Sequence, residues 1–69
     1  MTFLYAVTAT MTVPTESGYV VTKQLATFYL NPDVQGIINK PHARSIAARM
    51  LKSINPAASF SIDVEGVTL

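Results

Sequence analysis

The amino-acid sequence predicts an α+β fold, a β-β-α-β two-layer sandwich in which one helix covers one face of a three-stranded antiparallel sheet. Two segments with the pattern of strands, 2–13 and 19–30, flank a turn, and a third such segment spans 59–65. Between them, 41–54 carries the apolar spacing of an amphipathic helix. A chain of 69 residues makes one domain at most, so these four elements are expected to share a single small core.

The first thirty residues are predicted to form a long β-hairpin. Apolar residues alternate with threonines along 2–13, which is the period of a strand with two different faces. Residues 14–18 include Pro, Ser and Gly, which end a strand and reverse the chain. Residues 19–30 are again rich in β-branched and aromatic types, so they are expected to pair with the first strand.

The register of this hairpin is left open by the sequence. The preferred pairing sets Val13 opposite Val20 and gathers an apolar face toward the helix, made of Phe3, Tyr5, Val7, Ala26, Phe28 and Leu30. A slip of one residue exchanges the apolar residues that are left outside, so both registers leave apolar groups on the second face. In the preferred register this second face is the candidate interface, which consists of Leu4, Tyr19, Val21, Leu25 and Tyr29.

The helical segment has start and stop signals as well as an apolar stripe. The stripe consists of Ala43, Ile46, Ala47, Met50, Leu51 and Ile54. Asn39 or Lys40 is expected to cap the helix, with Pro41 in its first turn, and Asn55 followed by Pro56 is expected to end it. The preceding residues, 31–38, are predicted to form a loop in which a glycine takes an unusual φ.

The order of the elements predicts how the strands are arranged. A right-handed crossover through the helix makes 59–65 parallel to 19–30, and a gap between these two strands lets 2–13 pair with both. The predicted sheet order is therefore 2-1-3, with antiparallel neighbours and one open face.

No group of residues in the sequence indicates catalysis. Cysteine is absent, His42 stands alone, and the four acidic residues are scattered over a turn, a loop and the last strand. There is no nucleophile elbow, phosphate-binding glycine loop or metal-ligand spacing. We therefore expect a protein that is not an enzyme and that uses no cofactor, no metal and no small-molecule substrate.

The basic residues suggest an alternative function. Most of the cations lie on the predicted helix and form a candidate basic contact surface, made of Lys40, Arg44, Arg49 and Lys52. The alternative is a nucleic-acid-binding accessory protein, but a net charge of +1 favours it less, because such proteins are usually strongly basic.

Composition predicts association with a partner protein and a cytoplasmic location. Hydrophobic residues make up 49% of the chain and charged residues only 13%, whereas a small monomer usually carries about 25 to 35% charged residues on its surface. We therefore expect a homodimer, with another protein as a further candidate partner. No apolar run is long enough to span a membrane, and the first thirteen residues lack the pattern of a signal peptide.

One stretch of the chain resembles a known group of proteins. The residues that carry the resemblance are Phe28-Tyr29-Leu30, Val34-Gln35-Gly36-Ile37, His42-Ala43, Ile46-Ala47 and Leu51. Over this stretch the chain resembles small orphan proteins of unknown function encoded by phages of actinobacteria, similar to those of mycobacteriophages. The resemblance implies a phage origin, a location in the host cytoplasm and a host or phage protein as the further candidate partner, and it implies no catalytic residue.

Overall fold

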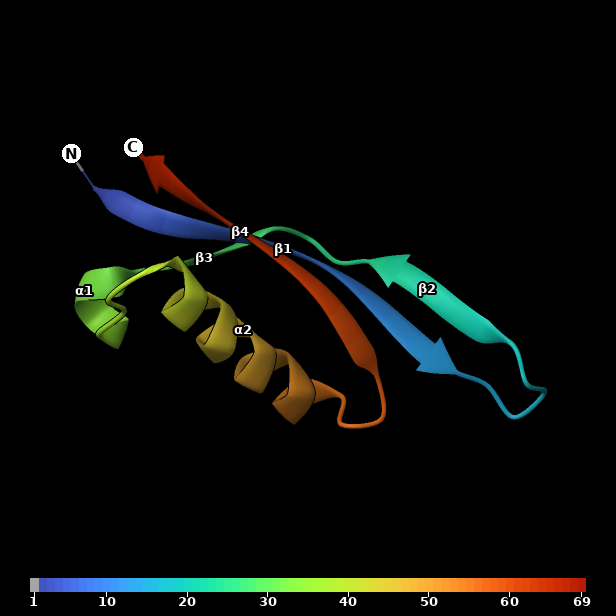
Figure 1. Ribbon diagram of the computed structural model, residues 1–69. Coiled ribbons are helices and arrows are strands. Elements are labelled where there is room, and N and C mark those ends of the chain that lie inside the picture. Colours follow the sequence, from blue (N-terminus) through green and yellow to red (C-terminus); the bar gives the residue numbers. More distant parts are fainter. Residues whose placement is uncertain (1) are drawn as a thin grey trace.

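The computed structural model describes residues 2–69. In chain order it contains β1 (Phe3–Pro14), β2 (Val20–Gln24), β3 (Phe28–Leu30), α1 (Pro32–Gln35), α2 (Lys40–Ile54) and β4 (Ser59–Thr68) (Figure 1). The long strand β1 is central, because β4 pairs along one of its edges and β2 and β3 pair along the other, always antiparallel. The α+β class and the order 2-1-3 are confirmed, with β2 and β3 together in the place of the second predicted strand.

The prediction of one continuous second strand is wrong, because a β-bulge divides it. Thr10 of β1 pairs with Gln24 of β2, whereas Val7 pairs with Phe28 of β3. Three residues, 25–27, therefore stand opposite two residues of β1, and the extra residue cannot pair. The hairpin continues through the bulge, where the N–H of Leu25 donates to the carbonyl of Ala9 at 2.9 Å.

The bulge also decides the hairpin register. Val13 pairs with Val21, so the expected pairing with Val20 is wrong by one residue. Residues that pair directly in an antiparallel ladder share a face. Phe28 and Leu30 therefore lie on the helix-covered face, as predicted, but Val21 does so too, because the extra residue reverses the alternation between β3 and β2.

The segment between β3 and α2 contains a helical turn where a loop was predicted. The side chain of Asn31 caps α1 by accepting a hydrogen bond from the N–H of Asp33 at 3.0 Å, and Gly36 ends α1 with φ 64°. Asn39 is the N-cap of α2, where its side chain accepts from the N–H of His42 at 2.9 Å. Helix α2 begins one residue before the predicted start, and β4 continues to Thr68.

A small core lies between α2 and the sheet. Its buried members are Val7, Leu30, Ile37, Ala43, Ala47 and Val64. The helix contacts the sheet through the buried side chains of Ala43, Ala47 and Leu51. Ile54, the last residue of the predicted stripe, lies outside the core, since it is 79% exposed. Among the fully buried residues, Leu30 and Val7 have the largest side chains, and no aromatic ring of the described residues is fully buried. Little apolar volume therefore holds the two layers together.

The molecule is elongated along the direction of β1. Its principal extents are 48 × 18 × 16 Å. Figure 1 shows the start of β1 and the end of β4 side by side at one end of the sheet, and the turn between β1 and β2 at the other, beyond the end of α2. No helix within residues 2–69 is long and apolar enough to cross a membrane.

Candidate interaction surfaces

A two-stranded hairpin arm projects from the covered part of the sheet. We define it as residues 13–21, because β4 pairs with β1 only as far as Thr12, and the next residue, Val13, pairs with Val21. The turn is closed by two backbone hydrogen bonds, from the N–H of Thr15 to the carbonyl of Tyr19 at 2.8 Å and from the N–H of Gly18 to the carbonyl of Thr15 at 3.1 Å. Gly18 has φ 87°, which favours glycine at this position.

The hairpin arm exposes apolar side chains on both of its faces. All five residues of β2 are exposed. Tyr19, Val20 and Val21 have exposed fractions of 76%, 63% and 55%. A two-stranded hairpin is marginally stable on its own in water, and here α2 does not extend beneath it (Figure 1). The arm therefore carries apolar side chains that the other residues of the described part of the chain leave exposed.

The open face of the sheet carries a second, smaller apolar patch near the chain ends. Leu4 pairs with Val67, and Ala6 pairs with Tyr29, so these four side chains share the face away from α2. Tyr29 is 56% exposed and Leu4 is half-buried.

The five predicted interface residues do not form one surface. Leu4 and Tyr29 lie in the patch near the chain ends, Tyr19 and Val21 lie in the hairpin arm, and the half-buried Leu25 lies in the bulge between them. The prediction of a single face is wrong because it assumed an unbroken alternation through 19–30. The exposed Val20, which that prediction left out, belongs to the arm.

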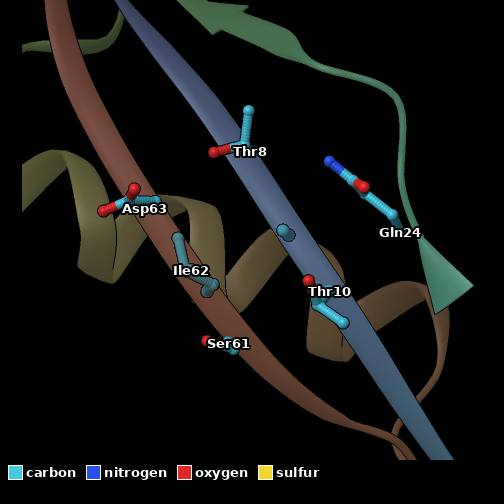
Figure 2. A pocket seen from close by; sticks show the side chains of 7 residues that line it. Thr8, Thr10, Gln24, Ser61, Ile62 and Asp63 are labelled. Atoms are coloured by element: carbon cyan, nitrogen blue, oxygen red, sulfur yellow. The ribbon is translucent and has the colours of Figure 1, made fainter. Parts of the chain in front are cut away.

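A polar depression lies between these two apolar regions, on the open face beside the bulge. Its polar lining consists of Thr8, Thr10, Gln24, Ser61 and Asp63. Figure 2 shows these side chains on three neighbouring segments, with α2 behind the sheet. The hydroxyl, amide and carboxylate groups can hydrogen-bond a small polar group. His42 belongs to the helix on the opposite side of the sheet, so Ser61 has no histidine beside it that could act as a base.

Sequence reasoning missed this depression, because it depends on the pairing of three strands. The one available signal was the row of threonines at 8, 10 and 12, whose side chains share one face of β1. Among the described residues, no group of three or more His, Asp or Glu side chains is placed to hold a metal ion.

The four predicted basic contact residues all lie on α2, but they do not converge. Successive helical residues are turned by about 100°, so Arg44 and Arg49 point about 140° apart around the axis. Lys40 and Lys52 are separated by about 18 Å along the helix. The Lys52 ammonium donates to the carbonyls of Pro56 at 3.1 Å and Ala58 at 2.8 Å. These two hydrogen bonds stabilise the loop between α2 and β4.

His42 is part of the start of α2. Its Nδ1 accepts a hydrogen bond from the N–H of Ile38 at 3.2 Å, while its own N–H donates to the side chain of Asn39. Together these bonds satisfy backbone donors at the start of the helix, a structural role of the kind that capping residues perform.

No family model, no curated protein and no solved structure matches this chain.

Proposed function

We propose that this protein is a non-enzymatic interaction domain that works as a homodimer. The supporting observation is an imbalance between surface and core. The chain exposes 4782 Å², whereas a compact monomer of 7.5 kDa exposes about 4,250 Å². Its radius of gyration is 13.5 Å, compared with about 11 Å for a compact chain of this length.

The size of the excess fits a small dimer interface. The surplus is about 500 Å² per chain, so two chains that buried it would remove about 1,000 Å², close to the lower limit for a specific interface. The chain has no cysteine with which to form a disulfide, and its core contains few large side chains. Association is the remaining general way to stabilise so small a domain.

The resemblance noted in the sequence extends this proposal. It would make the protein an accessory protein of a bacteriophage, which acts in the cytoplasm of the infected host and has a host or phage protein as a further partner. The only support for this part is the resemblance of residues 28–51 to those phage proteins.

The alternative of nucleic-acid binding has weaker support. The cations of α2 are spread around and along the helix, and Lys52 is bound to two carbonyls. Binding through this surface should weaken steeply with salt and on Arg49→Ala. A titration of labelled single- and double-stranded DNA and RNA at low salt tests it by fluorescence anisotropy, and flat curves would remove the alternative.

The experiment that tests self-association is the solution mass from light scattering over a series of concentrations. We expect the mass to rise from that of one 7.5 kDa chain to twice this value. A mass of one chain at all concentrations up to about 1 mM, where even a weak dimer would be substantially formed, would overturn the proposal.

A further inference from the structure

The outer edge of β2 has backbone groups available for another strand. The N–H of Leu25 points to β1, where it donates to Ala9, and the carbonyl of Tyr19 points to the same side, where it accepts from Thr15. Because successive residues of a strand point their backbone groups to opposite sides, the N–H and C=O of Val20, Thr22 and Gln24 point outward. In residues 2–69, β2 pairs with β1 alone.

The other edges of the sheet are less suited to pairing. A second copy of β4 paired about the middle of this strand would bring Asp63 opposite the partner's Glu65, and like charges in that position repel. Strand β3 has only three residues and runs into Pro32. By contrast, β2 carries one charge, on Lys23, and begins with β-branched residues.

We infer that two copies of this chain associate by antiparallel pairing of their β2 strands, which joins the two sheets into one. The inference rests on the proposed homodimer and specifies its interface. The arm lies beyond the end of α2 (Figure 1), so the helix does not obstruct a second copy. This mode of association uses backbone hydrogen bonds for affinity and side chains for register.

Charge and burial select one register. With the two-fold axis at Val21, this residue faces the partner's Val21, and Lys23 faces the partner's Tyr19, where an ammonium can lie over an aromatic ring. An axis at Lys23 would set two ammonium groups against each other. An axis at Thr22 would set Lys23 against the apolar side chain of the partner's Val21, and Tyr19 against the partner's Leu25, which lies in the bulge beyond the end of β2.

A proline substitution tests the edge pairing. Thr22→Pro removes an N–H that points away from β1, so the β1–β2 ladder keeps its hydrogen bonds, and proline is tolerated on edge strands in this orientation. The matched control is Thr68→Pro on the outer edge of β4. Its N–H also points away from β1, because the neighbouring Leu69 exchanges both backbone hydrogen bonds with Thr2.

Light scattering and circular dichroism then separate the outcomes. We expect Thr22→Pro to keep the fold and to weaken the dimer by about 100-fold or more, while Thr68→Pro leaves the dimer unchanged. A folded Thr22→Pro variant that still dimerises like the wild type would overturn β2 pairing without touching the proposed function. A wild-type protein that is monomeric at every concentration would overturn both.

Cross-linking tests the register on a chain whose backbone is unaltered. The natural sequence has no cysteine, so single-cysteine variants are unambiguous. Val21→Cys would place two thiols opposite each other with Cα atoms about 4.5 Å apart, within the range of a disulfide. We expect rapid formation of a covalent dimer by this variant on mild oxidation and little by Thr22→Cys or Thr68→Cys. Faster cross-linking of Thr22→Cys than of Val21→Cys would overturn the proposed register.

Discussion

The ring of Phe3 fills the space above Gly66 on the helix-covered face of the sheet. A Cβ atom at position 66 would lie 2.8 Å from Cζ and 3.0 Å from Cε1 of this ring. Tyr5, which pairs with Gly66, meets the same ring edge to face, with centroids 5.1 Å apart and an angle of 84°. The aromatic pair therefore covers a backbone position that has no side chain of its own, as aromatic residues do over glycines in other sheets.

This contact predicts that Phe3 and Gly66 are energetically coupled. Gly66→Ala should bring no gain in stability in the wild type, because the new methyl group displaces the Phe3 ring. In a Phe3→Ala background the same substitution should stabilise the protein by about 0.5 to 1 kcal/mol, the usual difference between glycine and alanine in a strand. Urea denaturation of the four proteins in the cycle measures the coupling. If the effects of the two substitutions on the free energy of unfolding are additive to within about 0.3 kcal/mol, the predicted coupling is contradicted.

At the scale of elements, the bulge at 25–27 controls which side chains of β2 face which way. Removing one residue makes the β2 and β3 registers equal, so deletion of Ala26 should yield a continuous strand in which all the present pairs persist. Deletion of Tyr29 should instead unfold the protein, because it turns either Phe28 or Leu30 away from the core.

Circular dichroism and amide exchange distinguish these two deletions. We expect a cooperative thermal transition for the Ala26 deletion, in which the amide of Leu25 still donates to Ala9 and stays protected, and no transition for the Tyr29 deletion. If the Ala26 deletion were the unfolded variant, the bulge would be a requirement of the fold rather than an insertion into it.

The local patterns of the sequence were enough to predict the helix, most of the strands and their order in the sheet. They were not enough to predict the interaction surfaces. The turn after β1, the cap of α2 and the alternation along β1 are local signals. The cap is Asn39, one of its two predicted positions, and the turn starts one residue later than predicted, because β1 includes Pro14. The bulge has no such signal, because Leu25, Ala26 and Thr27 suit a regular strand equally well. Its presence follows from the need to bury Phe28 and Leu30 against β1 while the arm keeps its own register, which is a tertiary effect.

The candidate surfaces could be predicted only as far as they follow from one strand. Tyr19 and Val21 were identified as exposed, but the bulge moved Val21 to the other face from Tyr29. The polar depression depends on side chains of three strands, so it could not be read from any single segment.

At the scale of the whole molecule, folding and association should be coupled. The core contains few large side chains, and the residues of β2 remain exposed among the described residues 2–69. A domain of about 70 residues retains only a few kcal/mol of stability from its own core. If the native protein is a dimer and the unfolded chain is a monomer, mass action stabilises the folded state as the concentration increases.

The melting temperature should therefore depend on protein concentration. For a dimer, a tenfold increase in concentration adds about 0.7 kcal/mol per chain, which corresponds to about 3 to 5 °C for a domain of this size. Thermal unfolding by circular dichroism over a hundredfold range of concentrations should show this rise for the wild type. The Thr22→Pro variant should melt at a lower temperature that depends less on concentration, because a smaller share of its folded chains is dimeric. A wild-type transition that stays fixed across the range would contradict this coupling, because the elongated monomer would then be stable by itself.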